Sequence, residues 1–350
     1  MRVIVVGAGV MGSASALELA EAGAEVVLLE RAVPGAEASS AAAGMLGAQL
    51  ESHHDPSELS LFLRARGRYV SWAEELRRLS GVDVGHRVTD AMRLAVTEAE
   101  VAALRDTVAH HLAGGARAEL LDADGARAIE PGLGDGILAA AHYPDESQVE
   151  PALLLRALAV AVARHPRVTV RSGATVSRVL TESGRAVGVV LEDSELRADA
   201  VVLAAGAWSS LVPSAPGVLP EVRPCRGQLL ELEERPPHVR TILAGRGAYI
   251  VPRGDGRVVC GSTLEFVGFR REVTAGGIHQ ILEGALRVLP SLASAELVRT
   301  WSSFRPHSST EKPLVGASPL PGLVLATGHH RNGILLAKVT AEAVKSAVFS

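Results

Sequence analysis

The feature that most constrains the fold is a glycine-rich turn near the amino terminus. A short apolar run, residues 2–6, leads into Gly7-Ala8-Gly9-Val10-Met11-Gly12, and apolar residues then recur at helical spacing. A second apolar run ends on Glu30. A glycine turn between a strand and a helix, with an acid about 20 residues on, is typical of a dinucleotide-binding βαβ unit. The alternative is an ordinary βαβ turn.

Each part of this motif has a physical task. Gly7 permits the tight turn out of the strand, Gly9 lets backbone approach a pyrophosphate, and Gly12 lets the helix pack closely on the sheet. The amides at the helix start, with roughly half a positive charge from the aligned peptide dipoles, would face the phosphates. Glu30 would accept hydrogen bonds from a ribose of the adenosine half.

Length, composition and net charge limit the classes of protein to which the chain can belong. With 350 residues, of which 47% are apolar and 21% charged, the chain is long enough for two domains and a large core. Its net charge of -4 and its lack of a basic run argue against a nucleic-acid or anionic-membrane partner. No stretch of about 20 residues is apolar without charge, so we expect no transmembrane span. Interior glycines and acids argue against a signal peptide, and the expected location is the cytoplasm.

Cysteines and histidines show no disulfide or metal pattern. Cys225 and Cys260 are too few for a disulfide scaffold, and we expect both to be buried, reduced thiols. Pairs of histidines invite a metal interpretation, but adjacent histidines seldom share one helical face, and no carboxylate completes a set. The sequence therefore predicts no metal site. The three pairs are His53-His54, His110-His111 and His329-His330.

Strand-like runs of two kinds predict the fold class. Residues 200–205 form a buried run that ends at Gly206, so we expect the chain to return to the first sheet there. From 228 to 261 the runs alternate, and a glycine-rich turn at 254–256 joins the last two as a hairpin. We therefore predict a mixed α/β (α+β) fold, with a Rossmann-like nucleotide-binding domain and an inserted antiparallel-sheet domain. The first would take residues 1–80, 145–215 and 305–350, and the second 81–144 and 216–304.

Helices are predicted where apolar residues recur at three and four. One such helix carries Tyr69 and Trp72 on its apolar face, and we expect these rings to lie in the core rather than at a ligand. Thr97 and Glu100 have the spacing of a capping box. Further helices are predicted over residues 151–163, 278–289 and 334–348.

Two glycine-bearing loops are candidate ligand contacts. Residues 31–47 follow directly on the nucleotide unit and are rich in alanine, serine and glycine, above all over residues 38–47. They would let backbone approach a flat or anionic ligand, and the alternative is a helix packed tightly on a neighbour. A second loop, residues 327–333, ends at the start of the last helix, where its amides could meet an electron-rich part of a cofactor.

Four segments carry a resemblance to a known family. They are residues 41–47, 249–253, 304–306 and 328–336. With these segments in order, the chain resembles the glycine oxidases, within the D-amino-acid-oxidase group of FAD-dependent amine oxidases, over nearly its whole length. The resemblance implies a two-domain flavoenzyme that oxidises the amine of a small amino acid to an imine. Water would then release ammonia and the keto acid, and dioxygen would be reduced to hydrogen peroxide.

The resemblance also assigns residues and partners. Arg305 and Arg331 would hold the substrate carboxylate, Tyr249 would help to position it, and Met45 would lie beside it. A homotetramer and a supply of product to thiamine thiazole synthesis are implied as well. From the glycine motif and the resemblance together, the residues expected at FAD are Gly7, Gly9, Val10, Met11, Gly12, Glu30, Arg31, Ala38, Ser39, Ala43, Gly44, Met45, Val176, Gly206, His329, His330, Arg331, Asn332, Gly333, Ile334 and Leu335.

The chain departs from the family pattern at three places. Leu264 stands where relatives carry an apolar residue such as methionine near the substrate, which leaves the tolerated substrate size open. Lys338 stands in place of a proline. Related sarcosine oxidases attach flavin through a cysteine after the carboxylate-binding region, but residues 306–312 contain none, so we predict non-covalent FAD.

The chemistry of three residues agrees with these roles and leaves alternatives open. A guanidinium offers paired donors that match the two oxygens of a carboxylate. Arg305, between an aromatic residue and a proline, is the first candidate ligand, and its alternative is a structural ion pair. Arg331 could instead serve the cofactor or the shape of its loop. Tyr249 could be a strand residue whose hydroxyl bonds at the core edge.

No dedicated acid or base is identified. Hydride transfer from the alpha carbon to a flavin needs orientation rather than such a group, provided that the amine is neutral. Asp145, Glu146, His329 and His330 are visible candidates without a partner evident from sequence. Two other functions stay open: a dehydrogenase that passes electrons to a quinone or partner protein, and a non-catalytic FAD-binding subunit of an amine-oxidising complex. A nicotinamide dehydrogenase is disfavoured, because a small-residue loop follows Glu30.

Overall fold

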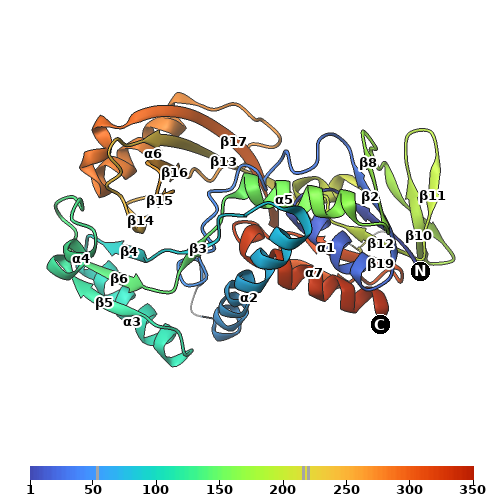
Figure 1. Cartoon of the computed structure of the whole chain (residues 1–350), viewed down its shortest axis with the longest axis horizontal. Helices are drawn as coiled ribbons and strands as arrows, with labels where there is room; N and C mark the ends of the chain where they lie inside the picture. Colours follow the sequence, from blue (N-terminus) through green and yellow to red (C-terminus); the bar gives the residue numbers. More distant parts are fainter. Residues whose placement is uncertain (53–54, 215–216, 219–220) are drawn as a thin grey trace.

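The computed structural model describes residues 1–52, 55–214, 217–218 and 221–350. The predicted pair His53-His54 lies outside these residues. Two large sheets occupy the two ends of an elongated molecule, and the chain passes between them more than once (Figure 1). Each end is therefore assembled from stretches that are far apart in the sequence. This is the mixed α/β architecture that the sequence predicts.

A six-stranded sheet carries the glycine turn. Its order is β18-β19-β12-β1-β2-β8, and all neighbours are parallel except β18 with β19. Since β1 lies between β2 and β12, the carboxyl ends of β1 and β12 border the crevice where open α/β sheets bind ligands. The predicted return of the chain to the first sheet is confirmed by β12. The strands are β1 Arg2–Val6, β2 Glu25–Glu30, β8 Val168–Ser172, β12 Ala200–Leu203, β18 Leu314–Ala317 and β19 Leu323–Thr327.

The central strands of this sheet are buried on both faces, as their continuous apolar runs require. In β1, Val3 and Val5 join one core cluster, and Ile4 and Val6 join another. Helices cover the first face, and a small antiparallel sheet covers the second. The helices are α1 Val10–Glu21, α2 Pro56–Ser80, α5 Pro151–Arg164 and α7 Gly333–Phe349. The small sheet contains β9 Arg178–Glu182, β10 Arg185–Val190 and β11 Glu195–Arg197.

An eight-stranded sheet forms the other end of the molecule. Its order is β17-β13-β16-β15-β14-β4-β6-β5, antiparallel throughout except for β14 with β4. The predicted hairpin of β15 and β16 is confirmed. The strands are β4 Ala91–Ala95, β5 Glu119–Asp122, β6 Ala139–Tyr143, β13 Val222–Glu233, β14 Ile242–Gly245, β15 Ala248–Pro252, β16 Arg257–Gly261 and β17 Glu296–Ser308. Around them lie α3 Glu98–Ala113, α4 Ala123–Ile129, α6 Ala275–Val288, η2 Pro290–Ser294 and the short pair β3 Arg87–Val88 with β7 Ser147–Gln148.

Local sequence signals determine where these helices begin. Thr97 accepts a hydrogen bond from the Glu100 amide at 3.2 Å, and the Glu100 carboxylate accepts one from the Thr97 amide at 3.1 Å, so the predicted capping box is confirmed. Helix α6 begins earlier than predicted because Thr274 caps its first turn. In α2, Tyr69 and Trp72 are buried in the core, as expected.

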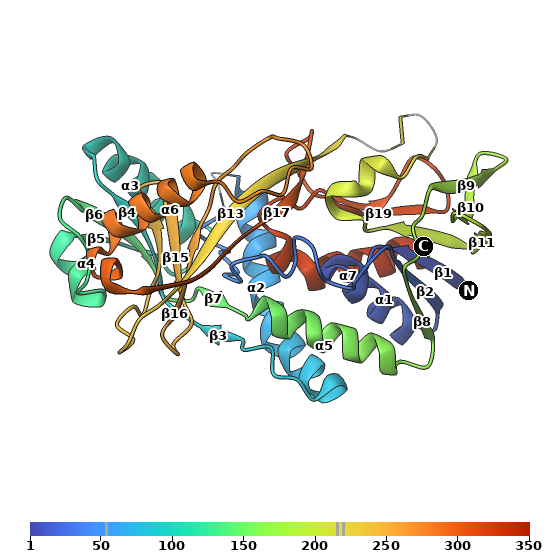
Figure 2. The same ribbon diagram turned by 90° about the horizontal axis from the view of Figure 1, so that it is seen from above.

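The long strands β13 and β17 connect the two ends of the molecule (Figure 2). Their ladder pairs Cys225 with Arg305 and Gly227 with Ser303. The domain boundary predicted at residue 305 falls inside β17. Both strands contact η1 Gly206–Leu211, which follows β12. Residues of the second sheet are thereby brought to the ligand-binding edge of the first.

Other sequence features have structural explanations. Lys338 donates hydrogen bonds to Glu18 and Glu75 and thus ties α7 to α1 and α2. Cys225 and Cys260 are both buried and unpaired, as predicted. Among the described residues, no cluster of side chains has the composition of a metal site. In the same part of the chain, no helix is long and apolar enough to cross a membrane.

Candidate active site

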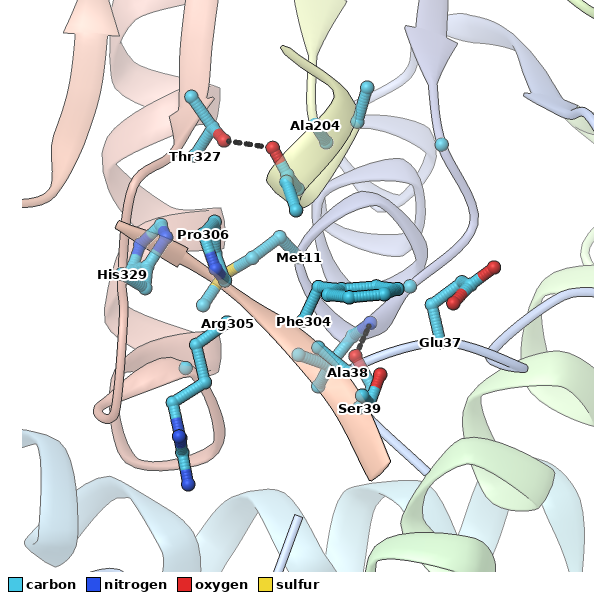
Figure 3. Close-up of a pocket in the computed structure, with 18 of the residues that line it drawn as sticks. Met11, Glu37, Ala38, Ser39, Ala204, Phe304, Arg305, Pro306, Thr327 and His329 are labelled. Carbon is cyan, nitrogen blue, oxygen red and sulfur yellow. Dashed lines mark hydrogen bonds between the residues drawn. The ribbon is translucent and has the colours of Figure 1, made fainter. Parts of the chain in front are cut away.

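A cavity of about 360 Å³ opens where the two sheets meet, at the carboxyl ends of β1 and β12. It is walled by the glycine turn, the small-residue loop, η1, β13, β17 and the loop before α7 (Figure 3). Most of the predicted site residues come together here. Those that line the cavity are Gly7, Gly9, Val10, Met11, Glu30, Arg31, Ala38, Ser39, Ala43, Gly44, Met45, Val176, Gly206, Tyr249, Arg305, His329, His330, Arg331, Gly333 and Ile334.

Three predicted residues do not line this cavity. A Cβ on Gly12 would lie 1.8 Å from the Gly7 carbonyl oxygen, so its part is the close packing of α1 against the turn, as expected. Leu335 is buried in the core beneath the site. Asn332 occupies the N-cap position of α7 and makes no side-chain cap bond. Neither Leu335 nor Asn332 forms part of the wall, and their contact with the cofactor stays a prediction.

The glycine turn is fixed by contacts on both sides. Gly7 has a φ of 98°, and a Cβ there would lie 2.6 Å from the Ala204 carbonyl oxygen. The Glu30 carboxylate accepts hydrogen bonds from the amides of Ala8 at 2.9 Å and Ala32 at 3.0 Å. The expected ribose acceptor therefore also holds the turn in shape. The Val10 amide donates to the Ser39 hydroxyl at 3.1 Å, which joins the small-residue loop to the start of α1 (Figure 3).

Buried polar atoms in the wall call for a polar ligand. Within the described residues, Ser303 Oγ, His329 Nδ1 and His330 Nε2 are buried without a hydrogen-bond partner, and all three residues line the cavity. Buried polar groups are rarely left unsatisfied, because their desolvation is costly. Together with the glycine cradle for a diphosphate, these atoms fit a large dinucleotide such as FAD. The residues that would hold it are those of the turn, the 38–45 loop and the loop before α7.

Arg305 and Tyr249 reach the cavity over glycines on neighbouring strands. A Cβ on Gly227 would lie 2.3 Å from the Arg305 guanidinium, and a Cβ on Gly261 would lie 2.6 Å from the Tyr249 hydroxyl. Since the strand order is β17-β13-β16-β15, the two side chains lean toward each other from opposite sides of this pair of glycines. The glycines thus make room for both side chains on one face of the sheet. The sequence analysis missed Gly227 and Gly261, because only strand register reveals them.

The two arginines predicted to hold the substrate carboxylate have different partners. Arg305 donates to the Thr263 carbonyl at 3.1 Å and to the Ser262 hydroxyl at 2.6 Å, both neutral acceptors. Arg331 donates two hydrogen bonds of 2.7 Å to the carboxylate of Glu51. Glu51 also lines the cavity and was not predicted. Its position directly after the small-residue loop is the signal that could have identified it.

The histidines of the cavity are neutral at physiological pH. Burial lowers the pKa of His329 to about 3. Burial, with the nearby Arg305, His307 and Arg331, lowers the pKa of His330 to about 3 as well. Imidazoles with such pKa values are weak bases. Both residues therefore shape the wall rather than exchange protons with a substrate.

The other candidate acids lie outside the cavity. Glu146 is fully buried, and its carboxylate accepts hydrogen bonds from the amides of Ala48 at 3.2 Å and Gln49 at 2.5 Å. Its burial raises its pKa. Asp145 forms an ion pair with Arg117 at 2.8 Å near the surface. Of the four candidates, only the neutral His329 and His330 line the cavity.

An aromatic cluster missed by the sequence analysis closes one side of the cavity. The Arg31 guanidinium lies 3.9 Å from the centre of the Trp208 ring. Trp208 stacks on Phe269 at 5.1 Å between ring centres and meets Phe304 edge-on at 6.0 Å. Leu264, in the same segment as Phe269, is 51% exposed and does not line the cavity.

Comparison with known proteins identifies the family. Residues 2–347 match the family named DAO, described as FAD dependent oxidoreductase. The chain belongs to the DAO family of FAD-dependent oxidoreductases. This membership agrees with a cavity that combines a dinucleotide cradle with a cationic anchor, and FAD is its cofactor.

Several proteins similar to this chain have known structures or names. A crystal structure of glycine oxidase from Geobacillus kaustophilus is 33% identical, covers 99% of this chain and 95% of its own, and superposes with a TM-score of 0.92. A crystal structure of iminodiacetate oxidase from Chelativorans sp. BNC1 is 29% identical, with a TM-score of 0.88 over 99% of this chain and 95% of its own. The bifunctional protein ThiO/ThiG of Nostoc sp. strain PCC 7120 is 35% identical over 99% of this chain and 52% of its own length. The chain thus spans about half the length of that relative.

The glycine beneath Arg305 gives a first prediction for this DAO-family chain. Gly227→Ala would push the guanidinium aside, because the far end of a flexible side chain moves more readily than backbone. We expect the KM for a carboxylate-bearing amine to rise by about tenfold, equivalent to about 1.4 kcal/mol, while FAD content stays normal. Steady-state kinetics and the flavin absorbance of the purified variant measure both. The control is Gly276→Ala, where the added Cβ meets nothing within 4 Å. An unchanged KM in Gly227→Ala would show that the position of Arg305 is unimportant.

Proposed function

We propose that the chain oxidises glycine or another small amine with one carboxylate, such as sarcosine or a small D-amino acid. The products are the imine, which water converts to ammonia or a small amine and the keto acid, and hydrogen peroxide from dioxygen. One observation carries this proposal. Arg305 is a cavity guanidinium that has no carboxylate partner among the described residues, and it faces Tyr249 across the two glycines.

The residues of the cavity would bind and orient the substrate. Arg305 offers its paired donors to the substrate carboxylate, and Tyr249 lies within the same part of the wall. Apolar side chains such as Met45 and Leu229 exclude water around the alpha carbon. FAD, when bound, would supply a hydride acceptor that dioxygen can reoxidise. His329 and His330 are neutral and weakly basic, so neither removes a proton from the substrate. The substrate amine therefore loses its proton before hydride transfer.

Three further properties belong to the same proposal. The lack of a cysteine in the cavity wall formed by the described residues supports FAD held without a covalent bond. The name ThiO/ThiG of one relative supports a supply of product to thiamine thiazole synthesis. The homotetramer expected from the family resemblance stays a prediction.

Anaerobic reduction of the bound flavin tests the proposal. We expect glycine, sarcosine and D-alanine to bleach the 450 nm absorbance of the purified protein, and admission of air to restore it with one peroxide per amine consumed. Bleaching followed by slow recovery in air and little peroxide would favour a dehydrogenase with a quinone or protein acceptor. A flavin that stays oxidised with all three amines would contradict the proposal and favour a non-catalytic FAD-binding subunit.

A further inference from the structure

Of the three arginines that line the cavity, Arg31 and Arg331 are paired with carboxylates and Arg305 is not. The contacts of Arg305 are to a carbonyl and a hydroxyl, and in the described part of the chain no carboxylate pairs with it. Arg331 is held by both oxygens of Glu51, at 2.7 Å each. This bidentate pair uses the Nε and Nη2 donors of Arg331, the edge that matches the two oxygens of a carboxylate. The positive charge of Arg331 is therefore already compensated by Glu51.

The position of Glu51 is fixed by its own loop. Its amide donates to the Gly47 carbonyl at 2.8 Å, and Gly47 has a φ of 69° that favours glycine. The amides of Ala48 and Gln49 donate to the fully buried carboxylate of Glu146, which anchors the segment just before Glu51. The Glu51 side chain is only 13% exposed. Its pairing with Arg331 is thus built into the fold rather than a loose surface contact.

We propose that Glu51 determines specificity by restricting the cavity to amines with a single carboxylate. A dicarboxylic amine would place its first carboxylate on Arg305 and its second near Arg331. There the second carboxylate would face the negative charge of Glu51, which already pairs with Nε and Nη2 of Arg331. The inference deepens the proposed function, on which it rests, and it names the substrate class that the cavity rejects: N-carboxymethyl amino acids, in which the amine carries two carboxylates.

Removing the charge of Glu51 without changing its size should relax this restriction. Glu51→Gln keeps the shape of the side chain and leaves Arg331 with an unpaired positive charge. Charge pairs at partly exposed sites are weakened by solvent and salt, so we expect an effect near tenfold rather than thousandfold. The effect should be confined to ligands with a second carboxylate, because Arg305 keeps its neutral partners.

Two ligands that lack an amine allow this effect to be measured by binding alone, without turnover. Methoxyacetate is the ether analogue of sarcosine, with one carboxylate, and diglycolate is the ether analogue of iminodiacetate, with two. Each is titrated into the FAD-loaded protein while the change in flavin absorbance is recorded. The quantity of interest is the Kd for diglycolate divided by the Kd for methoxyacetate. We expect this ratio to be above one in the unmodified protein and to fall about tenfold or more in Glu51→Gln.

A matched control variant separates the specific effect from a general change of charge. Glu37 also lines the cavity, but it pairs with Arg31 at 2.8 Å and Arg271 at 2.5 Å. In Figure 3 it lies well away from Arg305, with Phe304 between them. Glu37→Gln should leave the ratio of Kd values unchanged. An equal fall in both variants would overturn the inference, as would no fall in Glu51→Gln.

A second variant keeps the inference testable if Glu51→Gln fails to bind FAD. Arg331→Met leaves Glu51 without its counter-charge, so the ratio of Kd values should rise above that of the unmodified protein. A lower or equal ratio would contradict the role of Glu51. These titrations need no catalysis. Failure of glycine and sarcosine to reduce the flavin would therefore count against the proposed function, and an unchanged ratio would count against the inference alone.

Discussion

Arg305→Ala is expected to raise the KM for glycine by a factor of about 100 or more. Truncating one partner of a desolvated, hydrogen-bonded charge pair costs about 2–5 kcal/mol, and each 1.4 kcal/mol is a factor of ten. Arg305 is the only arginine in the described cavity wall that is neither paired with a carboxylate nor stacked on an aromatic ring. No neighbouring cation can replace it without breaking a contact of its own.

The expected kinetic pattern distinguishes binding from folding. Because the carboxylate is remote from the breaking C–H bond, its loss should raise KM more than it lowers kcat, although a poorly oriented substrate will also react more slowly. Arg305→Lys should recover only part of the affinity, since an ammonium lacks the planar pair of donors. Stopped-flow flavin reduction at increasing glycine concentration measures both quantities.

A control for this prediction lies on the same strand. Arg299 of β17 is exposed, pairs with Glu231 at 2.9 Å and does not line the cavity. Arg299→Ala should leave the KM for glycine within about twofold of the unmodified value. If Arg305→Ala also gave a near-normal KM, the assignment of the carboxylate site would be wrong.

The sequence predicts this fold best where its signals are local. The glycine turn, the capping box of Thr97 with Glu100 and the hairpin around residues 254–256 each depend on neighbours within a few residues. Their geometry follows from backbone rules that any chain obeys. The parallel sheet could be predicted as well, because a strand buried on both faces has to be a continuous apolar run.

The substrate side of the cavity depends on contacts between distant segments. Arg305 and Gly227 are 78 positions apart in number, yet the antiparallel ladder of β13 and β17 places them together. Glu51 and Arg331 likewise meet only because two loops face each other across the cavity. Neither pair has a local pattern, since register and loop geometry arise from packing of the whole molecule. The resemblance to a family identified the arginines, but it gave no partner for either.

Asn332 and Leu335, two of the residues predicted at the cofactor, do not form part of the cavity wall. Both belong to a loop and helix start that do approach the cavity through His330 and Gly333. In a helix, successive residues point in directions about 100° apart, so a continuous stretch cannot all face one ligand. Leu335 points into the core instead.

The second large effect is expected for Gly12→Ala, which should yield protein without bound FAD. The added Cβ would lie 1.8 Å from the carbonyl oxygen of Gly7 and 2.9 Å from its carbon. These are backbone atoms, and Gly7 is itself held between the Leu29 carbonyl and the end of β12. The turn and α1 must therefore separate, which removes the surface expected to face the pyrophosphate. We expect the ratio of 450 nm to 280 nm absorbance to fall nearly to zero.

A helical glycine elsewhere provides the matched comparison. Gly67 lies within α2, and a Cβ there meets nothing within 4 Å. Gly67→Ala should keep its full FAD content and gain roughly 0.5–1 kcal/mol of stability, because alanine is favoured over glycine inside a helix. If Gly12→Ala retained FAD like Gly67→Ala, the close contact of α1 with the turn would not be needed for binding. The dinucleotide cradle would then have to lie elsewhere along the cavity, and the placement of the substrate relative to Arg305 would change with it.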